Sequence, residues 1–273
     1  MKKIVMIIAA LLLCAQVFSQ EINVMSYNIR MGEAKDGTNS WELRYPATFY
    51  MLDDQKPDVF GVQEAYDYQV EFILESFDKT YKAVGVGRED GKSKGEHMSI
   101  FYNKNVISLL KWGTFWLSET PEVPSLGWDA ACIRTATWAL MKHKKSGKKF
   151  YMVNTHLDHV GVEARKQGLL LISSRLAEIN KEGYPLVLTG DFNVLKTDPS
   201  IQVIMEKMKS AREYAETSDD LGSYNGWGHA SDQIDYIFYD GFSSCPKFET
   251  VTKSYCNRKF VSDHFPVRAT LCF

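Results

Sequence analysis

Leu186-Val187-Leu188-Thr189-Gly190-Asp191-Phe192-Asn193 is the stretch of this chain that says most about its fold. It opens as a short apolar run, which is typical of a buried strand. Asp191 and Asn193 lie two positions apart where the strand ends, so a tight turn lets both side chains face one point. A carboxylate can orient a water molecule and an amide can hold a developing oxyanion, and we therefore interpret this strand end as part of a catalytic site.

Two earlier apolar strands also end in polar side chains. Asn28 closes a strand that begins near Ile22, and Glu64 follows the run at residues 58–63. Both side chains supply oxygen atoms, and Mg²⁺ prefers one or two carboxylates together with amide, water and phosphate oxygens. The sequence therefore predicts a divalent metal near Asn28 and Glu64.

Two histidines and another aspartate complete this set of strand-end residues. His156 and His264 are suited to a phosphoryl group, as hydrogen-bond donors or as proton carriers near neutral pH. Asp235 can orient His264 through a ring N–H. Taken singly, each of these residues is more often a turn former or a solvated loop charge. Taken together, they predict metal-assisted, in-line hydrolysis of a phosphate ester.

Strand patterns alternate with a few helical ones, without a linker or an internal repeat. One helix is predicted at residues 45–55, with Pro46 in its first turn. A second is predicted at residues 163–180, whose apolar residues recur every three or four positions. Further strands are predicted at residues 99–102, 135–142, 149–154, 233–239 and 266–271.

Residues 1–20 have the layout of a secretory signal peptide, with a short basic start, an apolar run at residues 4–13 and a plausible cut near its end. That run is about half the length of a membrane-spanning helix. Cys14 closes the run, but the bulky Leu13 before it argues against lipoprotein anchoring. We expect an exported protein, periplasmic or extracellular, with residues 21–273 forming one catalytic domain.

Charge and cysteine content narrow the possible partners. Without Lys2 and Lys3 the formal charge of −2 becomes −4, which argues against tight, unspecific binding to nucleic acid. The cysteines after residue 20 show no zinc-site spacing. Cys245 and Cys256 can pair in an oxidising compartment or remain as buried free thiols, and the sequence leaves both possibilities open.

The strand-end residues belong to motifs that follow one another in one order. These are Ser26-Tyr27-Asn28-Ile29-Arg30, Gln63-Glu64, Asn154-Thr155-His156-Leu157-Asp158, Gly190-Asp191-Phe192-Asn193, Ile234-Asp235-Tyr236-Ile237-Phe238 and Ser262-Asp263-His264. Their order resembles the endonuclease/exonuclease/phosphatase superfamily of DNase I-like enzymes. The nearest resemblance is to its CCR4/nocturnin-like branch of small secreted bacterial members.

This resemblance implies an α+β fold, a four-layer α/β/β/α sandwich in which two mixed sheets pack face to face. It places the site at one edge, where loops of both sheets meet. It implies metal binding by Glu64, Asn28 and Asp263, with Mg²⁺ as the cofactor and Mn²⁺ as a substitute. It implies catalytic roles for Asp191 and Asn193 at the water and phosphate, for the pair formed by His264 and Asp235, and for His156 as a second phosphate-binding histidine.

Two further residues are predicted to bind substrate. Glu96 lies in Gly95-Glu96-His97-Met98-Ser99-Ile100-Phe101-Tyr102, which resembles a segment that holds a glutamate in the CCR4/nocturnin branch. His97 and Met98 stand where that branch favours small residues. Arg134 can contact a substrate phosphate or form a salt bridge within the protein.

The sequence thus predicts an exported, divalent-metal-dependent phosphoesterase that hydrolyses a phosphate mono- or diester with an activated water. Its substrate is expected to be a small-molecule, lipid-linked or nucleic-acid phosphate ester, and the protein to be a monomer without an obligate protein partner. A secreted nuclease acting on DNA or RNA is the alternative. An inactive binding module of the same fold is a remote one, because it has no need of the whole polar set. The absence of a nucleophilic cysteine motif argues against a cysteine-dependent, non-phosphate hydrolase.

Overall fold

The computed structural model of the chain describes residues 20–273. The predicted signal peptide, residues 1–20, therefore lies outside the described residues except for Gln20. Within the described part, none of the helices combines the length and the apolar character needed to cross a membrane.

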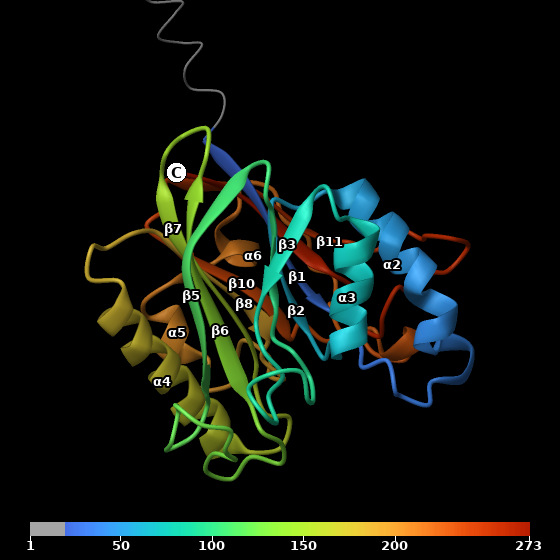
Figure 1. The fold of residues 1–273 in the computed structure, drawn as a ribbon, viewed down its shortest axis with the longest axis horizontal. Coiled ribbons are helices and arrows are strands. Elements are labelled where there is room, and N and C mark those ends of the chain that lie inside the picture. The colour runs from blue at the N-terminus through green and yellow to red at the C-terminus, as the bar shows by residue number, and fades with distance from the viewer. Residues whose placement is uncertain (1–19) are drawn as a thin grey trace, which may run out of the picture.

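Two six-stranded sheets form the centre of the fold (Figure 1). The first contains, in spatial order, β11 (Ser244–Thr250), β12 (Val267–Cys272), β1 (Glu21–Asn28), β2 (Val59–Gln63), β4 (Ile100–Asn103) and β3 (Tyr81–Val84). The second contains β5 (Ile107–Trp116), β6 (Thr135–His143), β7 (Lys149–His156), β8 (Leu186–Asp191), β10 (Asp235–Asp240) and β9 (Lys209–Ser210). The pairs β1–β2 and β7–β8 are parallel and the others antiparallel, so both sheets are mixed, as expected.

Helices cover the outer face of each sheet (Figure 1). The first sheet is covered by α2 (Trp41–Gln55) and α3 (Asp67–Ser76), and the second by α4 (Val162–Ile179) and α5 (Gln202–Met205). The connections contain α6 (Ala211–Tyr214) and the 3₁₀ helices η1 (Gly37–Asn39) and η2 (Gly226–Gly228). The predicted four-layer α/β/β/α sandwich is confirmed.

Hydrophobic cores lie between successive layers. Val24 and Val187 belong to the core between the two sheets. Met51 belongs to the core beneath α2 and α3, and Ile172 to the core beneath α4. Because alternate residues of a strand point to opposite faces, each sheet supplies side chains both to the central core and to an outer one.

The structure departs from the expected elements at several places. The first helix begins at Trp41 rather than residue 45, because the Arg44 N–H already donates to the Ser40 carbonyl (3.2 Å). Pro46 consequently lies inside the helix rather than in its first turn. The strand β5 was not expected, because a bulge between Leu109 and Lys111 and an exposed middle interrupt its alternation. The helix α3 and the strand β3 were also missed.

The cysteines of the described chain are free. Cys245 is buried in the core between the sheets, whereas Cys256 is exposed. The pairing that the sequence left open is therefore absent, and Cys245 acts as a small apolar residue.

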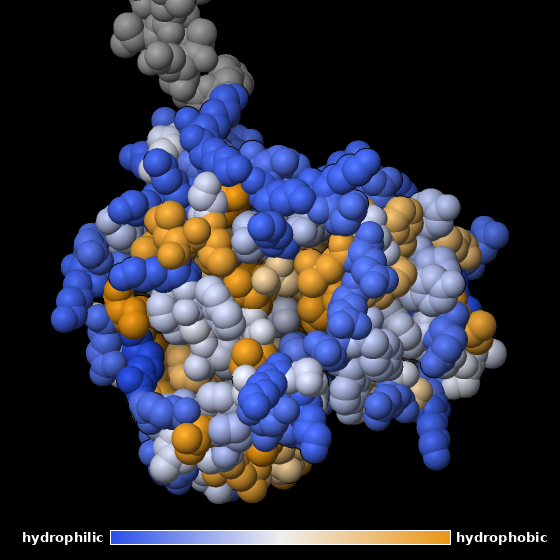
Figure 2. All heavy atoms as spheres, in the orientation of Figure 1, coloured by the Kyte–Doolittle hydropathy of each residue, from blue (hydrophilic) through white to orange (hydrophobic). Residues whose placement is uncertain are grey.

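The two ends of the described chain lie together at one end of the sandwich, where the Phe273 N–H donates to the Gln20 carbonyl (2.9 Å) (Figure 1). On the face drawn in Figure 2, hydrophobic residues form separate patches within a largely hydrophilic surface, which is ordinary for a folded domain. The strands β1 and β12 are antiparallel, so β1 starts beside the end of β12. Asn28, the last residue of β1, therefore lies at the opposite end of the sandwich.

Candidate active site

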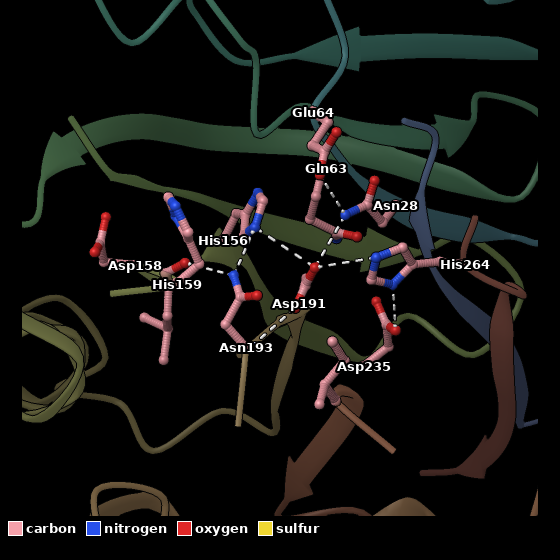
Figure 3. Close-up of polar contacts among 12 residues, drawn as sticks. Asn28, Gln63, Glu64, His156, Asp158, His159, Asp191, Asn193, Asp235 and His264 are labelled. Carbon is pink, nitrogen blue, oxygen red and sulfur yellow. Dashed lines mark hydrogen bonds and ion pairs between the residues drawn. The ribbon is translucent and has the colours of Figure 1, made fainter. Parts of the chain in front are cut away.

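Strand register brings the predicted residues to one edge of the sandwich (Figure 3). In the first sheet Asn28 is paired with Gln63, directly before Glu64. In the second sheet Asp191 lies between His156 on β7 and Asp235 on β10. Because β1–β2 and β7–β8 are parallel pairs, their carboxyl ends meet at the same edge, and loops of both sheets contribute to one site.

Unusual backbone conformations aim two of these side chains. Glu64 has a φ of 62° and Asn193 a φ of 55°, a left-handed region that non-glycine residues seldom occupy. The Met31 N–H donates to Glu64 Oε2 (3.0 Å), and the Asn193 N–H donates to Asp191 Oδ1 (2.9 Å). Such strain, held by local hydrogen bonds, is typical of functional positions.

Asn28 joins the two central carboxylates. Its Nδ2 donates to Glu64 Oε1 (3.1 Å) and to Asp191 Oδ2 (3.0 Å). Its Oδ1 accepts the Arg30 N–H (3.0 Å). The amide therefore presents nitrogen, rather than the oxygen of a metal ligand, to the carboxylates. In this arrangement Asn28 positions Glu64 and Asp191, and metal binding through Asn28 would require its amide to turn over.

Glu64 and Asp191 form the part of the site best suited to a divalent cation. Ligand atoms of Glu64, Asp191 and His156 all lie within 4.8 Å of one another. Burial and, to a smaller extent, the neighbouring Asp235 carboxylate raise the pKa of Asp191 above its usual range. Facing carboxylates fit a hard cation such as Mg²⁺. Asp263, the other predicted ligand, lines the same cleft with its Oδ2 3.5 Å from Arg30 Nε.

His264 and Asp235 form a buried ion pair, with 2.8 Å between His264 Nδ1 and Asp235 Oδ2. The Nε2 of His264 lies 3.6 Å from Asp191 Oδ2. Burial alone lowers the pKa of His264, but the Asp235 and Asp191 carboxylates outweigh it and raise the pKa to about 10. This imidazole is therefore cationic at neutral pH.

His156, in contrast, is neutral. Asn193 Nδ2 donates both to the Leu157 carbonyl (3.0 Å) and to His156 Nε2 (2.9 Å), so Nε2 accepts and the ring proton is on Nδ1. Burial, reinforced by the Arg134 and Arg88 cations, holds the pKa of His156 well below its usual value. The Nδ1 atom is buried without a hydrogen-bond partner among the described residues.

These groups line or underlie a cleft of about 490 Å³. Its walls include both predicted substrate-binding residues. Glu96 is buried there in an ion pair with Arg88 (2.8 Å). Arg134 lines the cleft, and it also forms the expected salt bridge within the protein, with Asp158 (3.3 Å). Its contact with a substrate phosphate stays a prediction.

Some residues of the cleft were missed at the sequence level. They are Arg30, Met31, Arg88, Cys132, His159 and Ile234, and Tyr224 lines the cleft beside them. Arg30 belongs to the same motif as Asn28, Ser26-Tyr27-Asn28-Ile29-Arg30, and could have been found there. Arg88 is one of several charged residues in its loop, and no local pattern distinguishes it from the others. The Tyr224 ring packs 4.9 Å from the His264 ring, a contact that depends wholly on tertiary structure.

Comparison with known proteins identifies relatives of the whole domain. Residues 25–264 match the sequence profile of the Endonuclease/Exonuclease/phosphatase family. A Bacteroides thetaiotaomicron structure described as an endonuclease/exonuclease/phosphatase family protein is 34% identical, covers 93% of this chain and 98% of its own, and superposes with a TM-score of 0.88. The mannosyl-6-phosphatase of the same organism is also 34% identical, over 92% of this chain and 100% of its own, with a TM-score of 0.87.

Human nocturnin shares the fold at 19% identity and a TM-score of 0.74, covering 93% of this chain and 94% of its own. The family and these neighbours indicate a hydrolase that acts on phosphate esters. The family match spans every motif that places a side chain at the strand ends. The chain therefore belongs to the endonuclease/exonuclease/phosphatase family.

Proposed function

We propose that the protein is an exported, Mg²⁺-dependent phosphatase that hydrolyses a phosphate monoester of a small, sugar-like molecule. The observation that carries this proposal is the placement of Asp191 between Glu64 and the cationic His264 at the floor of one cleft. The mannosyl-6-phosphatase of similar sequence and nearly full coverage favours a sugar phosphate over nucleic acid.

Asp191 is the residue best placed to accept a proton from the attacking water. The Asn28 amide and the Asn193 N–H each hold one of its oxygens, so the carboxylate is fixed before substrate binds. Fixed geometry of this kind lowers the entropic cost of aligning water with the phosphorus atom.

His264 and His156 complement the phosphoryl group in different ways. The cationic His264 offers its Nε2–H, while Asp235 fixes the ring from the other side. The neutral His156 adds an N–H without adding charge. Donors that are already oriented stabilise charge that develops on phosphoryl oxygens, because they need no reorganisation during the reaction.

A divalent cation fits between Glu64 and Asp191, because both present oxygen ligands to one point. When bound, the cation supplies Lewis-acid stabilisation of a phosphoryl oxygen. Asp191 accounts for activation of the water, and His264 and His156 account for stabilising negative charge on the phosphoryl oxygens.

Activity assays with purified residues 21–273 test this proposal. The substrates are hexose 6-phosphates, a simple phosphodiester, DNA and RNA, each with Mg²⁺ or with EDTA. We expect release of inorganic phosphate from a hexose phosphate, its loss in EDTA, and its recovery with Mg²⁺ or Mn²⁺. The matched variant Glu64→Gln should remain inactive with either metal. Cleavage of DNA or RNA without phosphate release from any monoester would instead establish the nuclease alternative.

Export is tested separately by expressing the full chain in a bacterium with a periplasm. We expect mass spectrometry to recover from the periplasmic fraction a chain that begins near residue 21. Recovery of a cytoplasmic protein that still begins at Met1 would overturn this part of the proposal.

A further inference from the structure

The loop that carries Arg88 and Glu96 brings a second charged pair into the cleft. Arg88 Nη1 donates to Glu96 Oε2 (2.8 Å), and the side chains are only 13% and 5% exposed. The backbone fixes the pair, because the Arg88 N–H donates to the Glu96 carbonyl (3.0 Å) and Trp116 Nε1 donates to the Arg88 carbonyl (2.7 Å). Both side chains line the catalytic cleft.

This pair lies beside Nδ1 of His156, the donor that the proposed function assigns to the phosphoryl group. Glu96 Oε2 is 3.9 Å from His156 Nδ1, too far for a hydrogen bond. Glu96 Oε1 and the remaining N–H groups of Arg88 also have no hydrogen-bond partner among the described residues. Unused donors and an unused acceptor therefore line one part of the cleft.

The part of the cleft that Arg88 and Glu96 line is poorly suited to bind a phosphate group. Phosphate oxygens accept hydrogen bonds, so the Glu96 carboxylate opposes them. A hydroxyl group both donates and accepts, and can bond to a carboxylate and to an N–H at once. Neighbouring hydroxyls also match the fork of N–H groups on a guanidinium.

We propose that Arg88 and Glu96 bind hydroxyl groups on the alcohol half of the substrate, which makes Arg88 a specificity-determining residue. This inference rests on the proposed function, because it assigns the leaving alcohol of a phosphate monoester. The pair then selects polyhydroxylated alcohols such as hexoses over simple alkyl alcohols.

Two substrates with the same phosphate and different alcohols test the inference. They are a hexose 6-phosphate and butyl phosphate, which has no free alcohol group. We expect the wild type to prefer the hexose phosphate. Arg88→Met should lower kcat/KM for the hexose phosphate about 10- to 100-fold, mainly through KM, because hydrogen bonds to a charged group are lost. Hydrolysis of butyl phosphate should change far less, so the ratio of the two kcat/KM values should fall.

Controls separate recognition from structure. Lys92→Met, an exposed change in the same loop, should behave as wild type. Arg88→Lys keeps the positive charge but lacks the paired N–H groups of the guanidinium, so it should lose part of the preference for the hexose phosphate. If Arg88→Met does not fold, Arg88→Lys is the variant that tests the inference. Free hexose should inhibit butyl phosphate hydrolysis by the wild type and not by Arg88→Met.

Equal losses on both substrates would overturn the inference, since they would show that Arg88 acts on the phosphate or on His156. A wild type that hydrolyses both substrates without preference would overturn it as well, yet leave the phosphatase proposal intact. A wild type that releases phosphate from no monoester would reject the proposed function itself.

Discussion

His156 and His264 are the same residue type in one site, yet their neighbours make one ring neutral and the other cationic. His264 is held by the Asp235 carboxylate, whereas His156 accepts a hydrogen bond from the Asn193 amide and faces arginine cations. Carboxylates stabilise an imidazolium, and burial beside cations stabilises the neutral ring. The site thereby obtains a charged donor and a neutral donor from identical side chains.

Replacing Asp235 with asparagine should change the pH dependence of catalysis. Asp235 helps to raise the pKa of His264 to about 10, and the protonated ring is the form that donates to phosphate. Activity is therefore retained below this pKa and lost as the pH rises through it. Asp235→Asn should lower the pKa, move the alkaline limb of kcat/KM to lower pH, and reduce activity at pH 7 by about 100-fold.

The pH profile of kcat/KM from pH 6 to 10.5 measures this effect. Asp240→Asn, at the exposed end of the same strand, should keep the wild-type profile. An unchanged alkaline limb in Asp235→Asn would show that His264 is not the group that sets it.

At the scale of the elements, a buried amide joins the two sheets below the site. Asn154 on β7 donates to the Val62 carbonyl of β2 (2.7 Å) and accepts from Gln63 Nε2 (2.7 Å). The chain can approach closely here because residue 61 is glycine, where an added Cβ would lie 2.2 Å from Asn154 Oδ1. This amide fixes the offset between the sheets, and with it the distance between Glu64 and Asp191.

Asn154→Ala should lower the free energy of unfolding by on the order of 3 kcal/mol, because it leaves the Val62 carbonyl buried without a partner. It also removes one of the two acceptors of the Gln63 amide, which keeps only Ser26 Oγ (3.2 Å). Urea denaturation followed by circular dichroism measures the change. Asn105→Ala, at an exposed position, should stay within about 0.5 kcal/mol of the wild type. Equal stabilities for the wild type and Asn154→Ala would contradict the proposed role of the amide.

Asp158 anchors two loops at the rim of the cleft. It accepts the N–H groups of Ala131 (3.1 Å) and Cys132 (3.1 Å) from one loop and of Gly161 (2.8 Å) from the other. Burial tends to raise its pKa, but these N–H groups and the Arg134 cation outweigh it and hold the pKa below its usual range. The depressed value means that ionised Asp158 stabilises the fold.

The contribution of Asp158 to stability should depend on pH. It is fully present above the unfolded-state pKa of about 3.9 and is lost as the pH falls through the lower folded value. Asp158→Asn should therefore be less stable than the wild type at pH 7, and this difference should shrink below about pH 4. Thermal unfolding across pH 3–7 tests this, and a difference that stays constant in acid would refute it.

Sequence patterns predicted the strands that carry the site, because their apolar runs end in polar residues that have no packing role. The union of both sheets at one edge came from the resemblance rather than from periodicity, and the parallel pairing of β1–β2 and β7–β8 was not predicted. Arg88 could not be found, because its place in the cleft depends on contacts with Glu96 and Trp116, which lie elsewhere in the chain. The orientation of the Asn28 amide depends on three contacts from different parts of the chain, so no local pattern encodes it.

At the scale of the whole molecule, the site concentrates negative charge where the two sheets meet. Glu64, Asp191, Asp235 and Asp263 lie at this edge, and within residues 20–273 the cations that pair with them are His264 and Arg30. His156 Nε2 lies 3.5 Å from Asp191 Oδ2, but this ring is neutral. Anions gathered in a dry site oppose folding unless cations balance them. A divalent ion bound between the sheets should therefore stabilise the entire sandwich and not only the loops that hold it.

Thermal unfolding with and without Mg²⁺ measures this coupling. An ion that binds only the folded state at 100 times its Kd adds about 2.7 kcal/mol, which corresponds to a Tm rise of roughly 5–10 °C for a domain of this size. We expect that rise for the wild type and for Arg88→Met, whose change lies outside the carboxylate pair. Glu64→Gln should lose most of it, since one facing carboxylate is gone. Na⁺ at matched ionic strength controls for general screening. An equal rise in Glu64→Gln would place the bound cation elsewhere and remove Glu64 from the metal site.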